Sequence, residues 1–342
     1  TLGREAFVSQ TPAGSISVDG LVNSKVGPFS DGETGHYNFD HHNQDRSFLM
    51  SSCKQVYERI KRGFVSEELA VRGLKPIVYV NELDHDTLTV LRVIAYAHLY
   101  ERQQSSTEDI VNIADAFDRN LGFYPHPLSD PLLKEFAAIF ATYFDIRAEL
   151  PYVSPRLWAA TIEAVFLRFD LFEAGRLEVE QTLCTDYVNV KELYPDLPDP
   201  QGFVFFSKES PFTRTSLFEQ KYSDYAYLLG ADGKSFRYSH GKIAPSSTFP
   251  LADFALVLNE VERSLGTAIT LSGESVDAEI NAWGGDDMTG GSPRGTGSAL
   301  PPHDYVHLRN AFSSYTGAGR GKYDPVKLPL FIREELPKLV VR

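Results

Sequence analysis

The sequence predicts an α/β protein of two domains: a mostly parallel N-terminal sheet with flanking helices and a helical middle, then a second, mixed α/β domain. Three observations predict this. Strand-like and helix-like segments alternate over the first ~120 residues. Residues 128–176 have a helical pattern throughout. After the Pro- and Asp-rich stretch 192–202, hairpin-like strands follow. A chain of 342 residues accommodates two domains, and we place them at 1–195 and 196–342.

The N-terminal elements follow from β-branched runs and helical spacing. Two short strands are expected in "SISV" and "HYNF", ending at Asp19 and Asp40. A helix with Ser47 as its N-cap is expected next, then a strand over 77–80. A second helix is expected to begin near Thr87. A third helix has a capping-type start in 106–122 and Gly122 as its stop.

The remaining elements are helical first and mixed afterwards. Helices are expected in 131–150 and 154–175, where the Phe and Tyr residues form the core of a helical layer. In the second domain we expect a strand over 202–209 and a hairpin over 225–243 that turns at Ala231-Asp232-Gly233. A helix follows over 250–266, before a glycine-rich segment.

Charge and cysteine content exclude several classes of function. The net charge is −13, whereas a general nucleic-acid or membrane-surface binder needs a basic face. We therefore expect a small anionic substrate, no membrane partner, and no nucleic acid beyond short oligonucleotides; a homodimer is left open. Two cysteines, Cys53 and Cys184, form no disulfide framework, and the N-terminus lacks a signal pattern, so a cytoplasmic location is expected.

Acidic and histidine side chains follow three of the predicted strands, where parallel α/β sheets gather functional groups. The set is completed by Asp115 in the third helix. We expect these side chains to hold two divalent ions, with Mn²⁺, Fe²⁺, Co²⁺ or Zn²⁺ preferred over Ca²⁺ because of the imidazoles. The predicted metal ligands are Asp19, Asp40, His41, His42, Asp84, Asp86 and Asp115.

Each of these motifs also has an ordinary structural interpretation. A lone aspartate after a strand is usually a turn residue or a helix N-cap, and the Asp84/Asp86 pair before a helix could serve as caps. The Asp-His-His triplet could be a polar loop. The metal interpretation depends on all of them lying between Asp19 and Asp115 at strand ends.

The same motifs resemble those of the DHH phosphoesterase superfamily. "NFDHH" resembles its signature triplet, and "VYVNELDHDTLTVLRVIAYA" resembles its Asp-x-Asp motif; "SISVDG" and "IVNIADAFDRNLG" resemble its other aspartate motifs. The resemblance covers about the first third of the chain and implies a dinuclear phosphohydrolase, typically with manganese, on a parallel sheet. Two departures are visible: the Asp-x-Asp motif follows the triplet instead of preceding it, and Val80 stands where the family has a histidine, with Asn81 as the nearest polar residue.

Catalytic roles follow for the triplet. Asp40 would bridge the ions, and His42 would bind one of them. His41 would stabilise or protonate the oxygen at the reacting phosphorus. His36 and Asp45 flank the triplet and could support the ligands through hydrogen bonds.

The glycine-rich segment 284–297 is a candidate substrate-binding loop, because glycines let backbone N–H groups approach an anion. It lacks the Gly-Lys-Ser/Thr of a phosphate-binding P-loop, and a surface loop is the alternative. In the DHH family a second domain with glycine-rich and basic residues grips substrate. The predicted substrate-binding residues are Gly290, Gly291, Ser292, Arg294, Gly295, Gly297 and Asn81.

The sequence therefore predicts a two-metal hydrolase of a phosphoester or phosphoanhydride in a small nucleotide or phosphorylated metabolite. Two alternatives stay open: a metal-dependent amide or C–N hydrolase on the same scaffold, and a non-catalytic module that binds a nucleotide or partner with a degenerate metal site.

Overall fold

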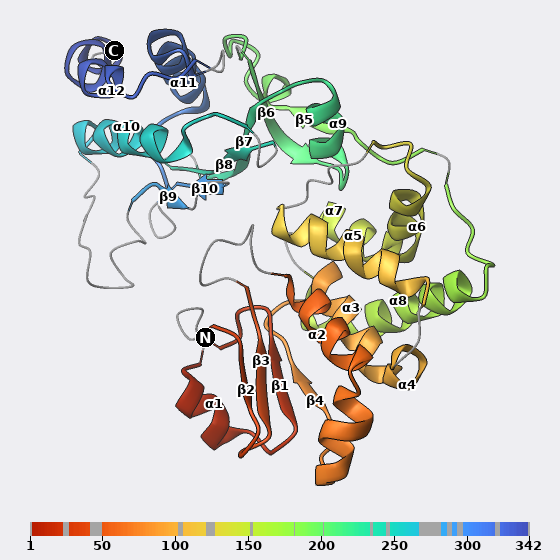
Figure 1. The fold of residues 1–342 in the computed structure, drawn as a ribbon. Helices are drawn as coiled ribbons and strands as arrows, with labels where there is room; N and C mark the ends of the chain where they lie inside the picture. Colours follow the sequence, from red (N-terminus) through yellow and green to blue (C-terminus); the bar gives the residue numbers. More distant parts are fainter. Residues whose placement is uncertain are drawn as a thin grey trace. The chain divides into compact units, whose positions relative to one another are not determined.

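The computed structural model describes residues 2–22, 27–41, 50–101, 105–120, 127–150, 153–180, 182–200, 202–232, 235–243, 247–266, 282–285, 289–292, 297–318 and 322–340. The chain forms two compact units, Thr1–Leu183 and Cys184–Arg342, each with its own sheet (Figure 1). The predicted α/β class with two units is confirmed. The units divide at the start of the extended segment before the first strand of the second sheet.

The first unit is built on a four-stranded sheet in the order β2-β3-β1-β4. Its strands are β1 (Ser15–Val18), β2 (Phe29–Asp31), β3 (His36–Phe39) and β4 (Ile77–Tyr79). Strand β1 runs parallel to both β3 and β4, and β2 is the antiparallel edge. Val18 pairs with Phe39, and Ser17 pairs with Tyr79, so the three parallel strands end side by side.

Helices of the first unit lie on both faces of this sheet and in a further layer. They are α1 (Arg4–Gln10), α2 (Ser52–Lys61), α3 (His85–Ala95), α4 (Ala97–Tyr100), α5 (Thr107–Arg119), α6 (Pro131–Ile139), α7 (Ala141–Glu149) and α8 (Trp158–Glu173), with short turns at Phe64–Leu69, Ala70–Arg72 and Pro155–Leu157. On one face, Phe7 of α1 packs edge-on against His36 and Tyr79. On the other face, Tyr37 and Phe39 pack against Phe64, which follows α2.

The predicted helical middle is confirmed as a layer with an aromatic core. Phe136, Phe140 and Phe169 are fully buried, with ring centroids 4.8 Å apart for the first pair and 5.8 Å for the second. A buried guanidinium joins this layer to α3: Arg92 pairs with Asp170 and Glu173 of α8, each at 2.8 Å. The layer therefore fixes α3, which begins at the predicted metal edge.

The second unit contains a six-stranded sheet in the order β5-β6-β7-β8-β10-β9. The strands are β5 (Tyr187–Asn189), β6 (Phe203–Glu209), β7 (Asp224–Ala231), β8 (Phe236–Lys242), β9 (Gly284–Gly285) and β10 (Thr289–Gly291). Only β6 and β7 pair in parallel, and α9 (Thr213–Glu219) lies between them in the chain. The predicted hairpin is the β7–β8 pair.

Helices of the second unit enclose a buried ion pair. These elements are α10 (Leu251–Ser264), α11 (Pro302–Thr316), α12 (Lys327–Leu330) and α13 (Leu336–Val340), with short turns at Val190–Glu192 and Phe331–Glu335. Arg309 of α11 binds Asp224 of β7 in a forked arrangement, with N–O distances of 2.9 and 2.6 Å. Its guanidinium also lies over the rings of Phe203 and Phe249.

Most predicted elements are present, with shifted ends. The first of the three helices predicted before residue 122 begins at Ser52 with Ser51 as N-cap, and the predicted cap Ser47 lies outside the described residues. The second begins at His85, two residues before the expected start. Gly122, the predicted stop of the third, is also outside the described residues. No helix within the described ranges is both long and apolar enough to cross a bilayer.

Candidate metal and substrate site

The candidate site lies where the three parallel strands of the first sheet end. Asp19 follows β1, Asp40 and His41 follow β3, and Asp84 lies between β4 and α3. Asp40 and His41 are almost fully buried. Because the strands are parallel and in register, sequence segments far apart in the chain supply groups to one edge.

Asp19 is held by the backbone of the neighbouring strand. Its N–H donates to the carbonyl oxygen of Phe39 and to Oγ of Ser52, both at 3.2 Å. The Ser52 hydroxyl donates in turn to the same Phe39 carbonyl at 2.9 Å. Asp19 has a φ of 51°, in the left-handed region where aspartate is enriched among non-glycine residues. The turn therefore fixes the carboxylate at the strand end.

Asp84 begins α3 through a complete capping box. Its Oδ1 accepts a hydrogen bond from the N–H of Thr87 at 2.8 Å, and the Thr87 hydroxyl accepts one from the N–H of Asp84 at 2.9 Å. The capping interpretation of this residue is thus confirmed. Capping occupies one carboxylate oxygen and does not by itself exclude a second role.

Two carboxylates lie at the N-terminus of α2. Oδ1 of Asp115 accepts a hydrogen bond from the N–H of Ser51 at 2.7 Å, and Oδ1 of Asp86 accepts one from the N–H of Cys53 at 2.9 Å. Negative charge is favourable there because of the unpaired amides and the helix dipole. Asp86 is fully buried, and its second oxygen, Oδ2, has no hydrogen-bond partner among the described residues. An unpaired buried carboxylate oxygen is costly unless something else binds it.

Asp115 is occupied by protein contacts on both oxygens. Its Oδ2 accepts from Nε and Nη2 of Arg119, one helical turn away, at 3.0 and 2.7 Å. Its assignment as a metal ligand stays a prediction. Another aspartate on the same helix lies closer to the predicted histidine ligand.

That aspartate is Asp118, which the sequence reasoning missed. Its Oδ2 lies 2.7 Å from Nε2 of His41, while Oδ1 of Asp19 lies 3.9 Å from the same nitrogen. His41 is fully buried. The geometry of this contact is not that of a hydrogen bond, so it is an ion pair when the ring is protonated. The signal that could have found Asp118 is its spacing three residues after Asp115 on one helix.

Several carboxylates at this site influence one another's ionisation. Burial, followed by the charges of Asp84, Asp86, Asp118 and Asp40, raises the pKa of Asp19 far above its ordinary value. Burial and the charges of Asp118 and Asp84 likewise raise the pKa of Asp86. Like charges buried together favour protonation or a bound cation.

The donor set fits a divalent transition metal in its chemistry. It consists of carboxylate oxygens and at least one imidazole, the combination that suits Mn²⁺ or Fe²⁺. Among the described residues, no three His, Cys, Asp or Glu side chains converge closely enough to hold an ion as they stand. His42 and Asp45 lie outside the described residues. His36 begins β3, at the end of the strand opposite to Asp40, and its Nε2 lies 3.0 Å from the carbonyl oxygen of Thr11.

In the second unit, close contacts or backbone conformation explain why glycine occupies the described positions of the candidate loop. A Cβ on Gly290 would come within 2.5 Å of Nε2 of His240 and 2.7 Å of the Gly284 carbonyl oxygen; on Gly291 it would meet the Tyr238 carbonyl oxygen at 2.9 Å. Gly297 has a φ of +68°. Close packing between strands therefore requires these glycines, whether or not a ligand binds.

Buried polar groups of α10 anchor both ends of the same segment. Asn259 exchanges two hydrogen bonds with the backbone of Trp283, at 2.8 and 3.0 Å. The Glu262 carboxylate accepts from Nε1 of Trp283, from the Ser298 hydroxyl and from the Ala299 N–H. Trp283 is buried and stacks on Tyr238, so it packs in the core.

The substrate-binding assignments stay predictions. Ser292 is buried, and its hydroxyl accepts a hydrogen bond from the N–H of Tyr238 at 2.9 Å. Arg294 and Gly295 lie outside the described residues. Asn81 is exposed in the bend between β4 and α3.

Comparisons with protein-family models, with curated proteins and with solved structures find no match to this chain. The assignment of function therefore depends on the geometry of the chain itself.

Proposed function

We propose that the first unit is a metal-dependent hydrolase of a phosphoester or phosphoanhydride in a small nucleotide or phosphorylated metabolite. The observation that supports this is the group of five carboxylates at one sheet edge, Asp19, Asp40, Asp84, Asp86 and Asp118. Burial and the charges of this group raise the pKa values of Asp19 and Asp86. A buried edge of this kind lowers the stability of the fold unless a cation neutralises it.

Asp19, Asp40 and Asp86, with His41 and His42, are the residues that would hold the ions. Mn²⁺ is the first choice, with Fe²⁺, Co²⁺ or Zn²⁺ as substitutes. Two such ions supply a hydroxide at neutral pH and offset charge on a phosphoryl oxygen. Asp86 is suited to this because its Oδ2 is buried and lacks a partner among the described residues.

Asp118 would act as a positioning residue for His41. The 2.7 Å contact between Oδ2 of Asp118 and Nε2 of His41 restricts the orientation of the buried ring. His41 could then bind an ion or donate a proton to the departing oxygen. Either role requires a fixed ring, which burial and Asp118 provide.

Hydrolysis assays test this proposal. In the presence of MnCl₂, the protein should hydrolyse bis(p-nitrophenyl) phosphate or inorganic pyrophosphate, and EDTA should abolish the activity. Asp118→Asn should lower kcat by about 10²-fold, within the range for acid–base groups. Asp109→Asn, an exposed change on the same helix, should have no effect.

The alternatives predict other results. Hydrolysis of p-nitroanilide amides with no phosphoester turnover would favour an amide hydrolase. No turnover of either substrate class by the manganese-loaded protein would contradict the enzyme proposal and favour a binding module.

A further inference from the structure

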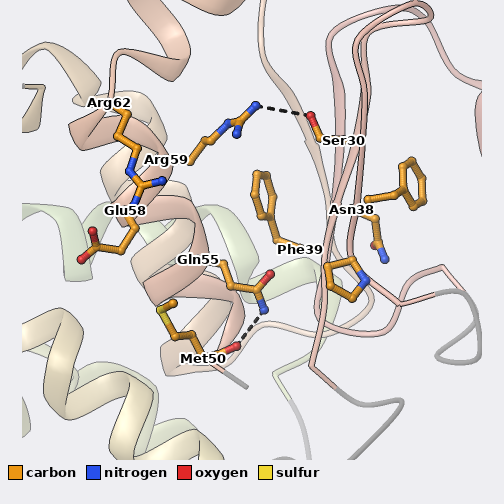
Figure 2. A pocket seen from close by; sticks show the side chains of 10 residues that line it. Ser30, Asn38, Phe39, Met50, Gln55, Glu58, Arg59 and Arg62 are labelled. Atoms are coloured by element: carbon orange, nitrogen blue, oxygen red, sulfur yellow. Dashed lines mark hydrogen bonds between the residues drawn. The ribbon is translucent and has the colours of Figure 1, made fainter. Parts of the chain in front are cut away.

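A pocket of about 340 Å³ opens between α2 and the β2–β3 edge of the first sheet (Figure 2). This volume lies within the range of small-molecule sites, about 300–1,000 Å³. Neither the sequence motifs nor the proposed chemistry assigns a role to it. Its lining includes Ser30, Phe39, Met50, Gln55, Glu58, Arg59 and Arg62.

The pocket has an apolar wall made of Phe39 and Met50. Figure 2 shows the Phe39 ring projecting from β3 into the space in front of α2. Met50, just before that helix, is 47% exposed. An exposed methionine beside an aromatic ring offers an adaptable apolar surface, and sulfur and ring faces both favour contact with aromatic ligands.

One guanidinium in the pocket has no close ion-pair partner among the described residues. The Glu58 carboxylate pairs with Lys54 at 3.0 Å, and Nη2 of Arg59 donates to both carboxylate oxygens of Glu68, at 3.0 and 2.8 Å. Ser30 is a further partner of Arg59. Arg62, the remaining charged residue of the lining, has no side-chain hydrogen bond or close ion pair to any described residue. Its charge helps to lower the pKa of Glu58, after the larger effect of Lys54. In a chain of net charge −13, an exposed guanidinium without a close ion pair beside an apolar wall favours an anion with an apolar part.

The pocket begins beside the acidic edge. Phe39 directly precedes Asp40, and Nε2 of Gln55 donates to the carbonyl oxygens of Asp40 and Met50, at 3.2 and 2.7 Å. Gln55 and Arg62 are seven residues apart, so their Cα atoms are separated by roughly 10 Å along the helix axis. A ligand in the pocket can therefore reach from Arg62 to the neighbourhood of Asp40.

We propose that this pocket binds the aromatic ring of the substrate, with the ring against Phe39 and Met50 and an anionic group at Arg62. The inference rests on the proposed function for calling this ligand the substrate, and it narrows the substrate class to phosphorylated compounds that carry a ring, such as nucleotides. Ring binding itself needs no metal.

Calorimetric titration in EDTA tests ring binding apart from hydrolysis. The probes are adenosine 5′-monophosphate and ribose 5-phosphate, which carry the same phosphate with and without a ring. The wild-type protein should bind the nucleotide at least about tenfold more tightly. Arg62→Ala should weaken nucleotide binding about tenfold, equivalent to about 1.4 kcal/mol. Arg156→Ala, an exposed arginine of the same unit, should leave it unchanged.

A second variant distinguishes a blocked pocket from a loss of nucleotide binding caused by unfolding. Met50→Trp should block the pocket and weaken nucleotide binding at least tenfold, while leaving the thermal midpoint of unfolding unchanged because Met50 is exposed. Equal affinity for both probes, no nucleotide binding at all, or an Arg62→Ala protein that binds as tightly as wild type would overturn the proposal. Failure of hydrolysis with intact ring binding would instead count against the proposed function.

Discussion

The two units differ in their buried charges: the second unit contains a buried ion pair, and the first contains a cluster of buried carboxylates. In the second unit, Arg309 and Asp224 form a forked ion pair that is almost entirely buried. At the edge of the first sheet, Asp19, Asp40 and Asp86 are crowded with other carboxylates, and burial together with repulsion raises the pKa values of Asp19 and Asp86. The fold alone explains a compensated pair, whereas binding of a cation would explain a cluster of like charges. The difference marks the first unit as the one with a candidate reaction site.

Breaking the compensated pair should give the largest effect. Arg309→Leu leaves the Asp224 carboxylate buried without its partner, and the free energy of unfolding of the second unit should fall by about 3–5 kcal/mol. Urea unfolding followed by Trp283 fluorescence, in a Trp158→Phe background, measures it. Arg333→Leu, an exposed change, is the control. A loss below about 1 kcal/mol would show that the pair is not the stabilising feature described.

Acid should also destabilise the second unit through His240. Burial lowers the pKa of this imidazole to about 4, below its ordinary value near 6.5. Between pH 6.5 and 4, His240 is protonated in the unfolded chain but not in the folded one. The free energy of unfolding should therefore decrease by about 3 kcal/mol in total as the pH is lowered through this range. Unfolding curves at several pH values should show that His240→Gln removes this part of the slope. His303→Gln, at an exposed histidine, should retain it; equal slopes in wild type and His240→Gln would contradict the account.

At the acidic edge, neutralising one charge should increase the free energy of unfolding, whereas the changes in the second unit decrease it. In metal-free protein at pH 8, Asp86→Asn should raise the free energy of unfolding of the first unit by about 1–3 kcal/mol. It keeps an oxygen for the Cys53 amide and removes a buried like charge. Urea unfolding followed by Trp158 fluorescence, in a Trp283→Phe background, measures it, with Asp109→Asn as control. Destabilisation by Asp86→Asn would show that the cluster is already compensated.

The sequence pattern predicted where the strands of the first sheet end better than it predicted which side chains meet there. Strand ends could be read from β-branched runs and from the polar residues that follow them, which located Asp19, Asp40 and His41. Whether Asp115 or Asp118 of α5 faces His41 could not be read, because it depends on how the helix is rotated about its axis. The start of α2 also depends on tertiary contacts, since Asp86 and Asp115 supply the oxygens that bind its first N–H groups.

In the glycine-rich segment the pattern pointed to anion binding, whereas the structure explains the described glycines by close packing. Gly290 lies against His240, a residue fifty positions earlier in the chain. Such proximity arises from the antiparallel pairing of β8 with β10, and one sequence does not reveal that pairing. Glycine content alone therefore did not distinguish a ligand loop from a tight strand contact.

Metal content is the most direct test of the central claim, that the acidic edge of the first sheet holds divalent cations. Elemental analysis should be made on the wild-type protein and on the double variant Asp40→Ala plus His41→Ala, each after soaking with Mn²⁺ and desalting. The account predicts about two ions per wild-type chain and their loss in the variant. No metal in the wild-type protein, or equal metal in both proteins, would contradict it.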